Sequence, residues 1–221
     1  MFLTFYLIMI YFKKKTKRTF FIIIIDMSRK ATNLTKKKIF EYCMKSFAEN
    51  GYSNVGLRNI SEGTKLSIGA IYYHFSSKEK IAQFLYDTAG RLILNEIKTA
   101  VENAADDREA LKSIILVLFK LTEEDPYLMK YVLYTKHKDF LPKAQPICST
   151  KPFEYIKKFI KAKIKEGVFE DMDVLIASSL IMGPIIRIIQ LRMDNVLKGD
   201  IRLYAESLLD GISRSIFKKQ I

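Results

Sequence analysis

Residues 67–81 read SIGAIYYHFSSKEKI, and this stretch decides what kind of fold the chain has. Ser67 can cap a helix over about residues 68–74, because a serine hydroxyl accepts a hydrogen bond from a free backbone N–H of the first turn. The small residues Gly69 and Ala70 occupy that turn, and two tyrosines and a histidine crowd the helix end. A protein core would space these aromatic side chains apart, and a catalytic site would need partner groups that the stretch lacks. The pattern predicts a helix that presents its end to a partner.

The preceding sequence predicts two more helices. Apolar residues recur at three- and four-residue spacing over about residues 35–50, with Thr35 as the expected N-cap and Gly51 after the last turn. A short helix over about residues 57–64 follows, and only a few residues separate it from the helix at 68–74. Two short helices joined by so tight a connection are typical of the helix-turn-helix motif of DNA-binding proteins.

A long fourth helix is predicted directly after the aromatic residues. Ser76 and Glu79 form the S-x-x-E pattern of a capping box, and the helical pattern then continues to about Asn103. The preceding short helix has small side chains on its leading turn, which allow a close approach of its backbone to DNA. The free N–H groups of a helix N-terminus also attract phosphate. Its tyrosines and histidine can then donate hydrogen bonds to the phosphates of a duplex.

The stretch at 47–85, FAENGYSNVGLRNISEGTKLSIGAIYYHFSSKEKIAQFL, carries a family resemblance. It resembles the DNA-binding head of the tetracycline-repressor (TetR) family of transcriptional regulators almost position by position. The pattern G-x-I-Y-Y-H-F-x-S-K-E-x is among the more specific short signals for that family. The close resemblance covers roughly residues 33–95, and the remainder agrees in length and helical character.

The resemblance implies DNA contacts at residues of the second, third and fourth helices. The start of the third helix, which is the recognition helix, faces base edges and nearby phosphates through Ser67, Ile68, Gly69 and Ala70. The aromatic cluster of Tyr72, Tyr73 and His74 contacts phosphates. Lys78, at the start of the fourth helix, contacts the DNA backbone, and Arg58 contacts DNA from the second helix.

Three residues depart from the family pattern. Lys65 stands where the turn usually holds a glycine, so either the lysine adopts a positive φ or the turn is built differently. Gly56 replaces the usual hydroxyl residue at the cap of the second helix, which removes one expected phosphate contact. Ile68 has no polar group, so any readout there is apolar, for example against a thymine methyl group.

Composition supports a polyanionic partner and gives no sign of catalysis. The net charge of +13 and the pI near 9.5 favour nucleic acid or an anionic membrane. Cys43 and Cys148 fit neither a disulfide framework nor a zinc site, and His74 and His137 lie far apart in the sequence. No phosphate loop or nucleophile–base pair is recognisable. We therefore expect a cytoplasmic protein that is not an enzyme and has no metal, no cofactor and no catalytic residues.

The first 26 residues differ in kind from the remainder. Two short apolar runs flank five basic residues, and each run is well short of the roughly 20 residues of a membrane span. One interpretation is a spurious extension, with translation beginning at Met27. The alternative is an amphipathic segment on a membrane surface, in which case the basic head would dock on anionic lipid. The helix-turn-helix pattern makes a membrane partner the less favoured alternative.

Residues 81–221 predict a helical body behind a head at 27–80, so the fold class is all-α. Further helices are expected at about 107–124, 127–137, 153–166 and 173–197 and from Gly199 to about Phe217, with a proline-rich loop at 139–152. The helix at 173–197 is apolar nearly all round and must be covered on several sides. With the last helix it could form a self-complementary face or an ordinary monomer core. The TetR resemblance implies the former, a two-fold homodimer.

The body is also where a pocket is expected, between the fourth helix and the helix at 173–197. Largely apolar residues are its candidate lining, with two polar anchors: Phe119, Met129, Tyr131, Tyr134, Met182 and Gln190, anchored by His137 and Arg187. Such a lining suits a hydrophobic or amphipathic small molecule. The sequence thus predicts a homodimeric repressor that binds a palindromic double-stranded operator and responds to a small-molecule effector.

Overall fold

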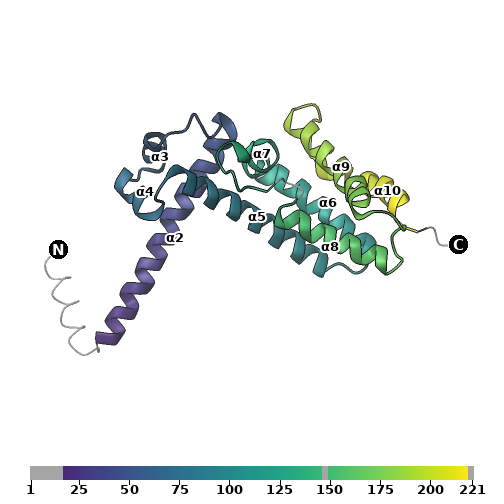
Figure 1. Ribbon diagram of the computed structural model, residues 1–221, viewed down its shortest axis with the longest axis horizontal. Helices are drawn as coiled ribbons and strands as arrows, with labels where there is room; N and C mark the ends of the chain where they lie inside the picture. Colours follow the sequence, from purple (N-terminus) through teal and green to yellow (C-terminus); the bar gives the residue numbers. More distant parts are fainter. Residues whose placement is uncertain (1–16, 146–148, 219–221) are drawn as a thin grey trace.

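The computed structural model describes residues 17–145 and 149–218, with side chains from Thr32 onward. Figure 1 shows a head at one end and a larger helical body beside it. The head consists of α2 (Lys17–Asn50), α3 (Leu57–Thr64) and α4 (Ile68–His74). The body contains α5 (Lys78–Glu102), α6 (Asp107–Glu124), α7 (Pro126–Tyr134), α8 (Lys151–Lys165), α9 (Val174–Met193) and α10 (Ala205–Ile216), with short 3₁₀ helices η1 (His137–Asp139) and η3 (Ile201–Tyr204). The predicted all-α class, with a helix-turn-helix head on a larger helical body, is confirmed.

The beginning of α2 differs from the prediction. The helix starts at Lys17, so Thr35 lies inside it and is not its N-cap. Residues 27–35 contain neither proline nor glycine, so nothing in the sequence interrupts the helix there. Residues 1–16, most of the segment interpreted as an extension, lie outside the described residues.

The cap of α5 also differs from the prediction, by one residue. Ser77, not Ser76, is in the extended conformation of an N-cap, and its Oγ accepts the Lys80 N–H at 3.4 Å. Further along the chain, α7 ends at Tyr134, three residues early, and α9 ends at Met193, because Asn195 adopts a left-handed conformation with φ of 58°.

The head has a small apolar core built around its three helices. Phe47 of α2, Ile60 of α3 and Ile71 of α4 are buried together, and α5 supplies Ile81 and Leu85. Since α5 continues into the body, where it packs on α6 and α8, one helix connects the head with the body.

Gly63 permits the close packing of α3 on α2. A Cβ atom at this position would lie 1.9 Å from a ring carbon of Tyr42. No real Cβ atom tolerates such a contact, so any other residue here would force either the Tyr42 ring or α3 itself to move. The recognition helix α4 follows α3 directly, and its position therefore depends on this glycine.

The turn between α3 and α4 is built around a left-handed lysine. Lys65 has φ of 57° and ψ of 34°, so of the two alternatives left open by the sequence the lysine with a positive φ is the one observed. The Ser61 Oγ donates to the Leu66 carbonyl at 2.6 Å, and the Leu66 N–H donates to the Ser61 carbonyl at 3.2 Å. These bonds hold the turn although a residue with a side chain pays a steric cost in this region.

Replacing Lys65 with glycine should stabilise the protein. Glycine adopts a positive φ without a steric cost, and after its greater freedom in the unfolded chain is subtracted we expect a gain of about 0.5–1 kcal/mol. Thermal unfolding should show a rise in Tm of about 2 °C. Asn195→Gly is the matched control, since Asn195 has φ of 58° and asparagine tolerates this region better. An equal or larger gain for Asn195→Gly would contradict the strain assigned to Lys65.

Candidate nucleic-acid interface and effector cavity

The short helix α4 exposes almost its whole surface. Ser67 caps it by accepting the Ala70 N–H at 3.1 Å, as the sequence predicted. Ile71 is the one residue of α4 that is buried, and Phe75, just beyond it, is buried as well. Because these two residues attach α4 to the head, the remaining side chains of the helix point outward.

The predicted base-reading and phosphate-contacting residues lie together on this outward surface. Ser67, Ile68 and Gly69 are exposed, and Ala70 is half-buried. Tyr72 is 50% and Tyr73 82% exposed, whereas His74 is half-buried with its ring edge-on to Tyr73 at 5.0 Å. A tyrosine that exposed contributes little to folding, so its phenol is available to a partner.

Arg58 and Lys78 lie at the edges of this surface and differ in their exposure and in their partners. The Arg58 side chain is 89% exposed and pairs with Glu62 at 3.1 Å. An exposed pair of this kind is weak, so the guanidinium can exchange it for a phosphate. Lys78 is half-buried: its Nζ donates to the Tyr52 carbonyl at 3.0 Å and lies 4.0 Å from the centre of the Tyr52 ring. An ammonium has three donors, and Tyr52 uses one of them.

The body contains a cavity of about 580 Å³ between α5, α7, α9 and the start of α8. The predicted residues Met129, Tyr131, His137 and Met182 line it. Most of its deeper wall is apolar, including Ile93, Leu94, Leu118, Phe153, Ile186 and Ile189. The volume and the apolar wall suit an organic molecule of moderate size.

The structure corrects the other four predicted lining residues, which do not line this cavity. Phe119 is fully buried in the core, and the Tyr134 hydroxyl faces the surface, where it donates to Asp194 Oδ1 at 3.2 Å. Because successive helical residues are about 100° apart, Gln190 lies about 70° and Arg187 about 130° around α9 from the mean direction of the lining residues Met182, Ile186 and Ile189. Sequence reasoning could not fix which face of so apolar a helix turns inward.

The cavity mouth is cationic, a feature that sequence reasoning missed. Arg91, Lys143 and Lys151 are exposed lining residues, and Asp87 is the one exposed acidic residue among them. Thr150 and Lys151 belong to the first turn of α8, whose helix dipole also favours an anion. These lysines and this arginine come from three separate segments, so no sequence motif marks them.

His137 lies in the cavity wall among aromatic rings. Its ring centre is 4.7 Å from that of Tyr131 and 5.0 Å from that of Tyr86. Burial lowers the pKa of His137 to about 4, so the imidazole is neutral near pH 7. Its Nε2 is buried and has no hydrogen-bond partner among the described residues.

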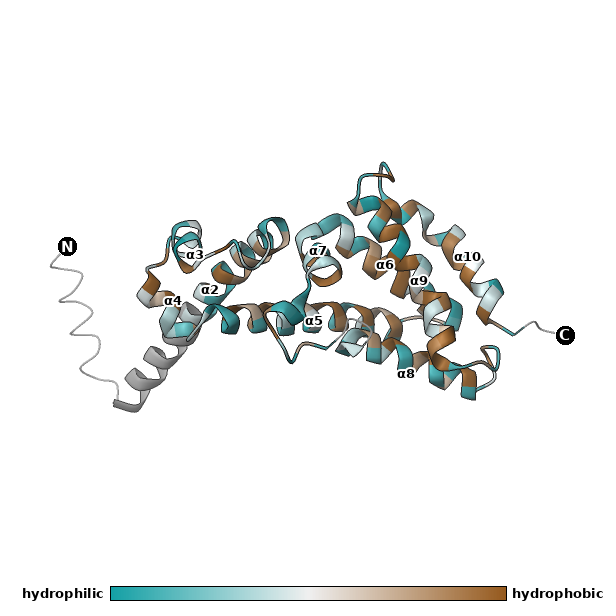
Figure 2. Ribbon diagram, turned by 45° about the horizontal axis from the view of Figure 1, so that its top comes forward, coloured by the Kyte–Doolittle hydropathy of each residue, from teal (hydrophilic) through white to brown (hydrophobic). Residues whose placement is uncertain are grey.

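Large apolar side chains of α9 and η3 are exposed, and we call them the apolar face. Leu175, Ile176 and Leu180 of α9 are exposed, as is Leu203, at 83%. Figure 2 shows hydrophobic segments along α9 and α10. By length and composition, α9 is also the one described helix that could cross a membrane, although it packs against α6, α8 and α10.

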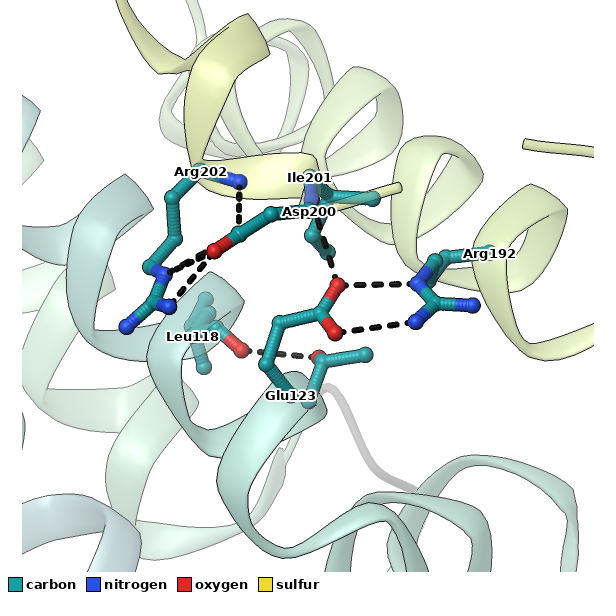
Figure 3. Close-up of polar contacts among 7 residues, drawn as sticks. Leu118, Glu123, Arg192, Asp200, Ile201 and Arg202 are labelled. Carbon is teal, nitrogen blue, oxygen red and sulfur yellow. Dashed lines mark hydrogen bonds and ion pairs between the residues drawn. The ribbon is translucent and has the colours of Figure 1, made fainter. Parts of the chain in front are cut away.

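An ion-pair clamp fixes this face on the rest of the body. The two carboxylate oxygens of Glu123 accept from Arg192 Nε and NH2 at 2.9 and 3.0 Å, and Oε1 also accepts the Ile201 N–H at 3.1 Å (Figure 3). The Arg192 guanidinium lowers the pKa of Glu123, and the pair stays ionised at neutral pH. The clamp holds the end of α9 and the start of η3 on the end of α6.

Comparisons with known proteins agree with this geometry. Residues 39–83 match the family model "Bacterial regulatory proteins, tetR family". The repressor KstR2 of Mycobacterium tuberculosis is 25% identical over 154 residues, which are 64% of this chain and 73% of that protein.

Solved structures share the whole architecture. A TetR family regulator from Marinobacter aquaeolei superimposes with a TM-score of 0.74 at 15% identity, covering 86% of this chain and 100% of the other. FadR from Bacillus subtilis, solved in complex with stearoyl-CoA, has a TM-score of 0.66 at 23% identity and covers 80% and 96%. The head of this chain thus matches the DNA-binding domain of the tetR family of bacterial regulatory proteins, and the chain shares the fold of solved TetR family regulators.

Proposed function

We propose that the protein is a cytoplasmic homodimeric repressor that binds a palindromic operator and is released by an amphipathic effector with an anionic head group. The observation that carries the proposal is a single chain in which an exposed recognition helix is joined by α5 to a cavity with an apolar wall and a cationic mouth. The protein acts through binding equilibria rather than catalysis. The proposed division of the chain is a head at 27–80 and a body at 81–221.

The head grips DNA through the exposed surface of α4 and its edges. Base edges are read by the small and apolar residues at the start of the helix, and phosphates are held by the aromatic cluster, Lys78 and Arg58. The base-reading set is Ser67, Ile68, Gly69 and Ala70, and the aromatic set is Tyr72, Tyr73 and His74. Phosphate contacts place the protein on the duplex, while base contacts select the sequence.

Dimerisation through α9 and α10 is supported by the exposed leucines and isoleucine of α9 and by Leu203 of η3, which leads into α10. An apolar face of this kind is unfavourable in water unless another surface covers it. A two-fold dimer places two recognition helices about 34–36 Å apart, one turn of the duplex. An effector that favours another spacing weakens DNA binding, provided that it binds the two conformations unequally.

The cavity supports an effector with two different ends. Its deep wall would bury an apolar chain, and Arg91, Lys143 and Lys151 would face an anionic head at the mouth. The structural neighbour FadR was solved with stearoyl-CoA, a molecule of this design, and the related KstR2 is described as a ketosteroid regulator. We therefore take stearoyl-CoA as the first probe.

The proposal is tested by fluorescence anisotropy with the full chain and the duplex upstream of its own gene. Stearoyl-CoA should weaken operator binding at least about 10-fold, since a coupling of 1–3 kcal/mol is typical of allosteric proteins. Coenzyme A, which lacks the tail, and methyl stearate, which lacks the anion, should have little effect. Equal release by methyl stearate would reject the anionic head, and no release by any of the three would reject this effector class.

A further inference from the structure

Tyr52, which precedes α3, joins the head to the body through one aromatic stack. Its ring lies on that of Phe140 with a centroid distance of 4.0 Å and an angle of 13° between the planes. Phe140 directly follows η1 in the body. Stacked aromatic rings attract each other beyond the burial of their apolar surface, so this pair couples the two segments.

On the head side, Tyr52 fixes the first turn of α5. Its carbonyl accepts from Lys78 Nζ at 3.0 Å, its ring faces the same ammonium at 4.0 Å, and its hydroxyl donates to Glu79 Oε1 at 2.9 Å. Two of these contacts hold the Lys78 ammonium directly, and the third holds the neighbouring Glu79. Lys78 is the cation that we propose on the DNA backbone, so Tyr52 orients a DNA contact without reaching the DNA itself.

On the cavity side, Phe140 belongs to a short segment that forms part of the cavity wall. We call residues 137–145 the strap. His137, Lys143, Ala144 and Gln145 of the strap line the cavity, and the Phe140 ring lies 6.0 Å from that of His137.

Hydrogen bonds hold the strap together and attach it to the body. The Leu141 N–H donates to the His137 carbonyl at 2.8 Å, and the Ala144 N–H to the Leu141 carbonyl at 2.8 Å. The Tyr86 hydroxyl holds the Gln145 carbonyl at 3.0 Å. These bonds make the strap one connected segment that is attached to α5 at Gln145.

We propose that Tyr52 is a positioning residue for Lys78 and that the strap, through the Phe140–Tyr52 stack, sets its position according to what fills the cavity. This inference rests on the proposed function. A molecule in the cavity touches the strap directly, and a displacement of the strap carries Phe140 away from Tyr52. Lys78 then loses its position on the head, and its ammonium group no longer contacts the DNA backbone.

The test measures operator affinity as a function of salt for the full chain and its variants. Phe140→Leu keeps an apolar side chain but removes the stack, and Phe140→Tyr keeps the stack. We expect Phe140→Leu to weaken operator binding about 5- to 10-fold. The plot of log K against log salt should also become less steep, by about 1 for each head, because one phosphate contact is lost there. Phe140→Tyr should retain the wild-type affinity and slope.

Two further variants separate positioning from general damage. Phe159→Leu is the matched control, because Phe159 also belongs to an aromatic pair, with Phe169, but both of these residues lie in the body and neither lines the cavity. It should leave the salt slope unchanged. Lys78→Ala should lower the slope as Phe140→Leu does, and the double variant should be no weaker than Lys78→Ala alone. A wild-type slope in Phe140→Leu, or losses that add in the double variant, would overturn the proposal.

The response to stearoyl-CoA tests the role of the strap and separates the two proposals. If the wild type is released, Phe140→Leu should bind stearoyl-CoA as before, measured by calorimetry, but should lose most of the release. If stearoyl-CoA releases Phe140→Leu from the operator as fully as it releases the wild type, the strap does not connect the cavity with the head, and α5 remains as the connection. If stearoyl-CoA does not release the wild type, the proposed effector class fails, while the salt slopes still decide whether Tyr52 and Phe140 position Lys78.

Discussion

Leu180→Asp should convert the protein into a monomer and lower its operator affinity at least about 100-fold. Leu180 is 39% exposed on α9 and belongs to the proposed dimer face. Dimerisation would bury the new carboxylate without a partner, and an unpaired buried charge costs several kcal/mol. A monomer also presents one recognition helix instead of two, so it loses the contacts of a whole half-site.

The matched control is Leu92→Asp. Leu92 is 41% exposed, as Leu180 is, but it lies on α5 rather than on the proposed face. Sedimentation equilibrium should show a dimer for Leu92→Asp and a monomer for Leu180→Asp, with circular dichroism confirming that both remain helical. A Leu180→Asp protein that stays dimeric and binds its operator normally would show that the interface lies elsewhere.

Tyr73→Ala should weaken operator binding about 30-fold without changing the stability of the protein. Tyr73 is 82% exposed, so its removal leaves no cavity and should move Tm by less than about 1 °C. Each head should lose about 1 kcal/mol of phosphate contact, and the dimer carries two heads, so the losses combine to about 2 kcal/mol.

Salt dependence distinguishes this loss from that of a cation. Tyrosine is neutral, so Tyr73→Ala should weaken binding with an unchanged salt slope, whereas Lys78→Ala should lower the slope. Tyr134→Ala is the control, since Tyr134 is a comparably polar, 41% exposed tyrosine on the body. If Tyr73→Ala binds as tightly as Tyr134→Ala, the aromatic cluster does not contact the DNA.

Local signals in the sequence were sufficient for the head. Ser67 at the N-cap and Ile71 at the buried position set the limits and the orientation of α4, and the helices at 57–64 and 68–74 were predicted to the residue. The predicted N-caps of α2 and α5 were wrong because the sequence allowed an alternative at each. Thr35 could have capped a helix, but no helix-breaking residue precedes it, so α2 begins earlier. Ser76 and Ser77 are adjacent, only one of them can be the cap of α5, and it is Ser77.

The sequence by itself therefore determined the helices, the all-α class and the outward surface of α4, because capping and periodicity act between residues a few positions apart. The tertiary structure alone decided which face of α9 lines the cavity, which three cations meet at its mouth, and that Tyr52 stacks on Phe140. These contacts join residues far apart in the chain, and they depend on how each helix is rotated about its axis. For a helix as uniformly apolar as α9, that rotation is fixed by packing against its neighbours, and its sequence pattern carries no record of it.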